Sequence, residues 1–167
     1  MSGLFWTAGG KLIGQTLTWC ITLIVIRLLD PVDYGMMSIT NVFVGYLTML
    51  NELGLGAAII QKKDLSEKDL KALFGMLIVA GLVFYLTLFF TAPIIAYFYD
   101  DTRLIHLIRV LALQFLFMGF TVLPQSLLLR DMKFDKIALV DFLSAISGSL
   151  TTLGLAFNGY GVWSLVW

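Results

Sequence analysis

The sequence predicts an all-α, polytopic transmembrane helical bundle. The first observation behind this prediction is composition: 59% of the residues are apolar and 13% are charged, against roughly 25% charged in soluble domains. A soluble chain of 167 residues has too high a surface-to-volume ratio to bury that much apolar surface. The second observation is that the charges gather in short loops between long apolar stretches, which is typical of helices that cross a bilayer.

Segment lengths then define the elements in order. A hydrocarbon core of about 30 Å needs about 20 helical residues, and five stretches reach that length before a sixth begins. We therefore predict five complete spans plus the start of a sixth, all within one transmembrane domain over residues 1–167. The predicted spans cover residues 4–29, 34–60, 72–99, 104–129 and 137–157, and the sixth, truncated, covers residues 161–167.

The basic residues predict the orientation. With the N-terminus in the cytoplasm, the inner side holds eight of the eleven Lys and Arg residues, namely Lys11, Lys62, Lys63, Lys68, Lys71, Arg130, Lys133 and Lys136. The outer side holds the other three, Arg27, Arg103 and Arg109. Cytoplasmic loops of membrane proteins carry such an excess, so the N-terminus is predicted to be cytoplasmic.

Several function classes are disfavoured at this point. The chain has one cysteine, Cys20, and one histidine, His106, so no metal site is expected. The net charge is zero, which gives no electrostatic footprint for nucleic acid. Every loop is short, so a globular active site has no place outside the membrane. We expect no enzyme and no cofactor, apart from a possible coupling proton or Na⁺.

Polar residues recur at helical spacing on one face of several spans. The first span shows this with Thr7, Lys11, Gln15, Thr18 and Thr22, the second with Tyr34, Ser38, Asn41, Gly45, Thr48 and Glu52, and the fifth with Asp141, Ser144, Gly148, Thr151 and Leu155. Close helix packing explains the small residues. The larger polar and charged ones fit a substrate cavity better, and the candidates are Lys11, Gln15, Arg27, Asn41, Asn51, Glu52, Gln114, Gln125 and Asp141.

Three of these candidates define a depth hypothesis. The rise of 1.5 Å per residue places Lys11 about 24 Å from Arg27 along the first span, and it places Glu52 at a similar depth in the second. Asp141 enters from the inner side. The hypothesis is an inner layer of Lys11, Glu52 and Asp141, with Lys11 as the counter-ion. Ionisable groups inside a span cost about 2.5–3.5 kcal/mol on insertion scales and normally mark a pathway.

Four segments in order resemble one family. They are Arg27-Leu28-Leu29-Asp30-Pro31-Val32-Asp33-Tyr34-Gly35, Asn51-Glu52-Leu53-Gly54-Leu55-Gly56-Ala57-Ala58-Ile59-Ile60-Gln61-Lys62, Ala92-Pro93-Ile94-Ile95-Ala96-Tyr97-Phe98-Tyr99-Asp100 and Gly159-Tyr160-Gly161-Val162-Trp163-Ser164-Leu165-Val166. Each is similar to a segment of the oligosaccharide flippase, or polysaccharide transporter, family of the multidrug/oligosaccharidyl-lipid/polysaccharide exporter superfamily. The resemblance covers essentially the whole chain.

The resemblance implies a fold and a function. Members of that family place two helical bundles around a central cavity. They flip undecaprenyl-diphosphate-linked oligosaccharides across the bacterial inner membrane by alternating access, for cell-surface polysaccharide such as lipopolysaccharide. This chain resembles the N-terminal bundle, so we expect a fragment of the full transporter. Its expected partners are the lipid-linked oligosaccharide, membrane lipids, and a C-terminal bundle or polysaccharide polymerase machinery.

Two alternatives stay open at this point. One is a cation-coupled drug exporter of the same superfamily, with Glu52 or Asp141 as the coupling carboxylate. Its cavity should show more acidic and aromatic lining. The other is a non-transporting membrane subunit that acts as a scaffold for a polysaccharide assembly complex.

Overall fold

The structure is a computed structural model that describes residues 15–16, 18–51 and 67–166. Within these residues every element is helical, which confirms the all-α prediction. The elements are a helix over Thr18–Leu28, α2 (Pro31–Asn51), α4 (Glu67–Phe98), α5 (Arg103–Ala112), the 3₁₀ helix η2 (Leu113–Phe117), α6 (Met118–Arg130), α7 (Phe134–Phe157) and the 3₁₀ helix η3 (Gly161–Leu165).

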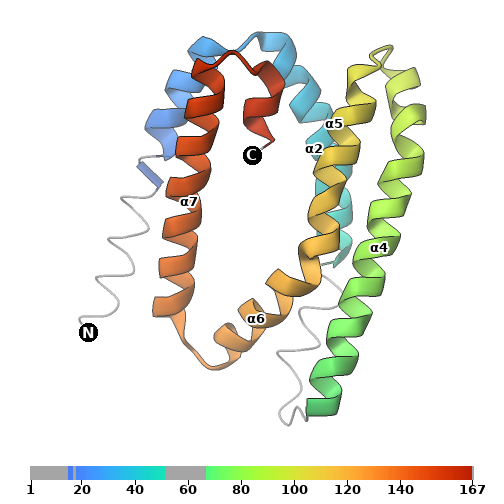
Figure 1. The fold of residues 1–167 in the computed structure, drawn as a ribbon, viewed down its shortest axis with the longest axis vertical. Helices are drawn as coiled ribbons and strands as arrows, with labels where there is room; N and C mark the ends of the chain where they lie inside the picture. Colours follow the sequence, from blue (N-terminus) through green and yellow to red (C-terminus); the bar gives the residue numbers. More distant parts are fainter. Residues whose placement is uncertain (1–14, 17, 52–66, 167) are drawn as a thin grey trace. The chain divides into compact units, whose positions relative to one another are not determined.

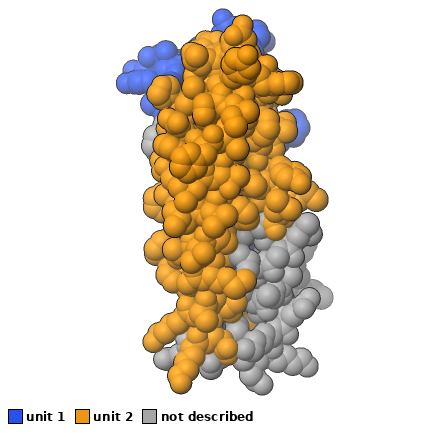
Figure 2. Space-filling view, turned by 90° about the vertical axis from the view of Figure 1, so that its right-hand side faces the viewer, with its two compact units in different colours: residues 1–37, 131–167 blue, residues 38–130 orange. Residues whose placement is uncertain are grey.

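The chain forms two compact units, coloured separately in Figure 2. Unit 1 contains residues 1–37 and 131–167, and unit 2 contains residues 38–130. The first boundary falls inside α2, so the first turns of this helix belong to unit 1 and the rest belongs to unit 2. Each unit is described by itself below.

Unit 2 is built around a long antiparallel helix pair. α4 runs for 32 residues, about 48 Å at the usual helical rise. The chain then turns at residues 99–102 and returns as α5 beside it (Figure 1). The core of the pair is apolar and closely packed: Ala92, Leu104, Ile108 and Ala112 are fully buried. Small residues at the contact let the two backbones approach, as in helix pairs in lipid.

The returning span bends where it changes from α5 to α6, and the bend coincides with η2 (Figure 1). Here α4 and η2 meet backbone to backbone, because a Cβ added at Gly81 would overlap the carbonyl oxygen of Phe115. Only glycine leaves room for that carbonyl. Beyond the bend, Gly119 of α6 lies against Ile78, and the rings of Phe74 and Phe120 pack edge to face with centroids 5.3 Å apart.

Unit 1 packs the helix Thr18–Leu28 against α7 and η3. The core contains Ile21 and Val25 of this first helix, Leu29 directly after it, and Ala156 of α7. Partly buried side chains complete this core: Tyr34, Leu153 and Leu165.

Two glycines set the connection from α7 to η3. Gly159 has a positive φ of 75° and ends α7 in a Schellman motif, in which the Tyr160 N–H donates to the Leu155 carbonyl at 3.2 Å. Gly161 has φ 54°, and a Cβ there would lie 3.1 Å from the carboxylate of Asp33. The connection therefore brings the resemblance segments around Asp33 and Gly161 together within unit 1.

Three of the described helical segments are long and apolar enough to cross a membrane: Lys68–Phe98, Arg103–Arg130 and Phe134–Phe157. They correspond to the predicted spans 72–99, 104–129 and 137–157. A shorter apolar helix, Thr18–Leu28, lies inside the first predicted span. Large apolar side chains such as Val79, Phe90 and Ile94 are exposed along α4. Apolar surface on this scale is rare in water and fits contact with lipid.

Candidate functional site

The described residues form a cavity of about 290 Å³ inside unit 1. Four elements line it: the helix Thr18–Leu28, the first turns of α2, the second half of α7, and η3. The lining residues are Thr18, Ile21, Thr22, Val25, Tyr34, Gly148, Ser149, Thr152 and Leu165. Ligand pockets usually occupy about 300–1,000 Å³, so this cavity has the size of a small ligand or of one ring of a larger one.

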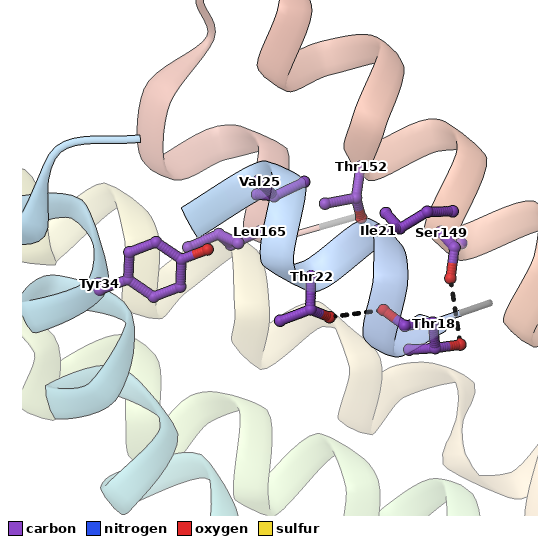
Figure 3. Close-up of a pocket in the computed structure, with 9 residues that line it drawn as sticks. Thr18, Ile21, Thr22, Val25, Tyr34, Ser149, Thr152 and Leu165 are labelled. Atoms are coloured by element: carbon purple, nitrogen blue, oxygen red, sulfur yellow. Dashed lines mark hydrogen bonds between the residues drawn. The ribbon is translucent and has the colours of Figure 1, made fainter. Parts of the chain in front are cut away.

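Hydroxyl groups from three helices converge on the cavity (Figure 3). Thr18 and Ser149 join the first helix to α7 through a hydrogen bond of 3.3 Å between their hydroxyls. Thr22 donates to the Thr18 carbonyl at 2.8 Å, which leaves its oxygen lone pairs available as acceptors. Thr152 of α7 and Tyr34 of α2 add two more hydroxyls.

The lining that the structure describes combines these hydroxyls with apolar side chains, and none of its residues is charged. Ile21, Val25 and Leu165 supply the apolar part, and Tyr34 is the one aromatic ring. A cavity of this kind can hydrogen-bond a neutral, hydroxylated group while packing against its carbon skeleton. These described residues offer neither a cation for phosphate nor a carboxylate for an organic cation.

Many other polar residues of the predicted stripes are satisfied within their own helices. The hydroxyls of Thr48 and Thr151 donate to the carbonyls of Val44 and Ser147, four residues earlier, at 3.0 and 2.8 Å. A hydroxyl bonded in this way can face lipid without an unpaired donor. Helical periodicity therefore does not by itself place these threonines at a cavity.

The candidates predicted from the sequence lie elsewhere. Lys11 and Glu52 lie outside the described residues, as does the side chain of Asn51, so the predicted inner layer stays a hypothesis. The remaining candidates are exposed on their helices: Gln15, Arg27, Asn41, Gln114, Gln125 and Asp141. Within the described part of the chain, the structure joins no two of these candidates by a hydrogen bond or an ion pair.

Sequence reasoning missed the contribution of α7 to the cavity. Its predicted polar stripe ran through Gly148 and Thr151, but Ser149 and Thr152 line the cavity together with Gly148. Gly148 and Ser149 are adjacent small residues, and Thr151 and Thr152 are adjacent threonines. The sequence therefore does not show which residue of each pair faces the cavity. The stripe of the first span was informative, since Thr18 and Thr22 both face the cavity.

Charges in unit 2 are segregated along its length. Lys68 and Lys71 lie in the first turns of α4 together with Glu67 and Asp69, and Arg130 ends α6. The other end carries Asp101 and Arg103, whose side chains form an ion pair of 2.6 Å. The Arg103 Nε also donates to Asp101 Oδ1 at 3.0 Å. Three basic residues thus lie at one end of the hairpin and one, Arg103, at the other, and an excess of Lys and Arg on one side is the pattern of a membrane-spanning hairpin.

Arg109 is the charged residue deeper in this hairpin. Its guanidinium carbon lies 4.1 Å from the centroid of the Phe89 ring on α4. Its Nε is buried without a hydrogen-bond partner among the described residues. In the described structure, the electrostatic partner of this guanidinium is therefore the face of the Phe89 ring.

Long apolar helices, lipid-facing apolar surface and end-segregated charge define a multi-pass helical membrane protein. The particular family follows from comparison with known sequences. The chain belongs to the polysaccharide biosynthesis protein family, whose model matches residues 24–167. This confirms the family resemblance drawn from the four segments.

Named relatives come from several bacteria. The chain is 28% identical over 154 residues to the teichuronic acid biosynthesis protein TuaB of Bacillus subtilis, covering 87% of this chain and 30% of that protein. It is 23% identical over 153 residues to the lipopolysaccharide biosynthesis protein WzxC of Escherichia coli, with 92% and 31% covered. It is 28% identical over 144 residues to the succinoglycan biosynthesis transport protein ExoT of Rhizobium meliloti, with 86% and 29% covered.

The chain thus spans about 30% of the length of these relatives. No solved structure matches the chain.

Proposed function

We propose that this chain forms the N-terminal helical bundle of a transporter that moves lipid-linked oligosaccharide repeat units across the bacterial inner membrane for cell-surface polysaccharide. The observation that carries the proposal is the family match over residues 24–167. It is supported by relatives named for the biosynthesis of three different polymers, one of them a transport protein.

The proposal includes the topology: five complete spans and the start of a sixth, with the N-terminus in the cytoplasm. Three apolar helices and the end-segregated charges of unit 2 support it. Transport by alternating access requires polar surface that faces a pathway. The exposed candidates Gln15, Arg27 and Asp141 supply such surface from the spans of unit 1.

The substrate is a diphosphate carrying hydroxyl-rich sugars on an isoprenoid chain. Arg27 is proposed to pair with phosphate charge at the outer end of the first span, because guanidinium groups bind phosphate oxygens bidentately. Asp141 is proposed to carry a coupling proton or Na⁺. No bond is made or broken in this transport, so the proposal needs no catalytic group.

Complementation tests the proposal. The open reading frame that encodes the chain, at its full natural length, is expressed in a strain whose own oligosaccharide flippase is deleted. Restored surface polysaccharide is the expected result. The proposal falls if the protein reaches the membrane at normal level and no polysaccharide appears at the surface.

Substitutions then test the assigned residues. Arg27→Gln should lower the initial rate at which vesicles containing the protein translocate a fluorescent lipid-linked oligosaccharide. Arg103→Gln is the matched control, because the Arg103 guanidinium, at the start of α5, already pairs with Asp101 in the preceding turn. Equal rates for the two variants would remove Arg27 from the pathway.

A further inference from the structure

We infer that the cavity of unit 1 is a binding site for one neutral saccharide ring, separate from the surface that meets phosphate. The choice of a saccharide over other neutral hydroxylated rings rests on the proposed function. The site itself is supported by the size of the cavity, by its hydroxyls and by the absence of charge among its described lining residues.

Size comes first. At about 290 Å³ the cavity is far larger than one water molecule needs, which is about 30 Å³. It lies just below the range of pockets that hold drug-sized ligands. A single six-membered ring with its substituents fits this scale, whereas a whole oligosaccharide does not.

The hydroxyls decide which ring. Five hydroxyl-bearing residues line the cavity, and Figure 3 shows Tyr34 on one side, Thr18 and Ser149 on the opposite side, and Thr22 between them; the fifth is Thr152. Each hydroxyl can donate one hydrogen bond and accept two. A sugar ring carries the same groups around its edge. The bonds within the protein use only part of this capacity, and an acyl or isoprenoid chain would use none of the rest.

The lack of charge decides which part of the substrate. Among the described residues that line the cavity there is no lysine, arginine, aspartate or glutamate, so this part of the lining gives a diphosphate no counter-charge. Ile21, Val25 and Leu165 instead provide apolar surface for the C–H face of a ring. The cavity therefore suits a sugar of the repeat unit rather than the diphosphate linker.

The site is also tied to the resemblance segments. Tyr34 belongs to the segment Arg27–Gly35, and Leu165 to the segment Gly159–Val166. Gly161, with its positive φ and its close approach to Asp33, fixes the path of η3 beside the first turn of α2. The segments that identify the family thus build two walls of this cavity.

Protection of a cysteine tests the inference directly. Thr22→Cys is placed in the full-length protein after Cys20→Ser removes the exposed native thiol. The rate of modification by N-ethylmaleimide is then measured in membranes with octyl glucoside below its micellar concentration, with glucose, or with octanol. Ile24→Cys is the matched control, since it is 45% exposed on the same helix and does not line the cavity.

We expect octyl glucoside to slow modification of the cysteine at position 22 at least threefold and to leave position 24 unchanged. Protection by glucose as well would identify the free sugar as a sufficient ligand, and protection by octyl glucoside alone would identify the lipid-linked form. Equal protection by octanol would overturn the inference in favour of an apolar-chain pocket. No protection would overturn it in favour of a packing void or a water site.

Hydroxyl removal provides the second arm. Thr152→Val in the same background should weaken protection about two- to tenfold, the effect of one hydrogen bond. Thr151→Val should not, because the Thr151 hydroxyl is exposed and bonded to the Ser147 carbonyl. Equal effects of the two substitutions would contradict the assignment. If octyl glucoside protects position 22 but the protein does not complement the deletion strain, the site is retained and the proposed transport is rejected. If the protein complements but shows no protection, the transport is retained and the site is rejected.

Discussion

At the scale of single residues, the structure separates polar side chains that their own helix satisfies from those that need a partner. Thr87 and Thr91 donate to carbonyls of α4 at 2.8 and 2.7 Å, so they face lipid without an unpaired donor. Arg109 cannot satisfy itself in this way, because a guanidinium has five donors and no acceptor. It lies over Phe89 instead.

Phe89→Leu should therefore destabilise unit 2. The substitution keeps an apolar side chain but removes the ring face, so we expect a loss of about 0.5–2 kcal/mol, seen as a lower thermal midpoint of the purified protein in detergent. Phe117→Leu is the control, because Phe117 is 62% exposed in the same unit and is not the ring over which Arg109 lies. Equal midpoints for the two variants would show that the ring contributes only its bulk.

The Asp101–Arg103 pair should make the turn between α4 and α5 sensitive to acid. The hydrogen bond from the Arg103 side chain lowers the pKa of Asp101. A carboxyl whose folded-state pKa is depressed contributes stability above its unfolded pKa, near pH 4, and loses it as the pH falls through the folded value. The pair is partly exposed, so its contribution is about 0.2–1 kcal/mol.

The measurement is the difference in thermal midpoint between the wild-type protein and Asp101→Asn as a function of pH. The wild type should be the more stable of the two from pH 7 down to about pH 4, and the difference should vanish towards pH 2. A difference that is constant across this range would mean that the carboxylate charge does not act at this turn.

At the scale of elements, the contact between Gly81 of α4 and the Phe115 carbonyl of η2 determines how the hairpin packs. The interface has no hydrophobic driving force in lipid, so it depends on close approach and dispersion contacts. A single methyl group at this point would push the bend of the returning span away from α4.

Gly81→Ala should lower the stability of unit 2 by about 1–3 kcal/mol, the usual penalty for overpacking. Gly75→Ala is the matched control on the same helix, because a Cβ there meets nothing within 4 Å. It should be neutral or stabilising by about 0.5–1 kcal/mol, since alanine favours a helix more than glycine does. The measurement is the thermal midpoint of each variant. A Gly81→Ala protein as stable as the wild type would contradict the close backbone contact.

The elements themselves were largely predictable. The predicted span 72–99 is α4, Glu67–Phe98, and the predicted span 137–157 is α7, Phe134–Phe157. Hydropathy marks the apolar part of a helix, whereas its polar first turn extends into the loop. α2 begins at Pro31 rather than at residue 34. The proline itself was the signal for this earlier start, because proline is favoured in the first turn of a helix.

The break in the fourth predicted span and the cavity were not predictable to the same degree. Residues 113–117 are apolar except for Gln114 and contain no glycine or proline, which predicts an uninterrupted helix, but they form the 3₁₀ helix η2 where they meet Gly81. That contact joins residues distant in sequence. Similarly, the packing of α7 on the helix Thr18–Leu28 places Ser149 and Thr152 at the cavity. Helical periodicity alone cannot predict to within one residue which face of α7 makes this contact.

At the scale of the whole molecule, the proposed topology places the turn at residues 99–102 outside and the turn at residues 131–133 inside. Single cysteines at these turns, in the Cys20→Ser background, report it. A membrane-impermeant maleimide should label Thr102→Cys in intact spheroplasts and Met132→Cys only after lysis. The exposed side chain of Met132, at 76%, makes its position accessible once the reagent reaches it. Labelling with the reverse sidedness would invert the topology.

The stacking of Arg109 on Phe89 has a consequence for biogenesis. An arginine within a membrane segment costs several kcal/mol when that segment meets lipid by itself. α4 is synthesised before α5, so the Phe89 ring is already present when Arg109 leaves the insertion machinery. We expect the two helices to enter the bilayer together as a preformed pair, and a chain that lacks α4 to retain residues 103–130 on the translocation pathway.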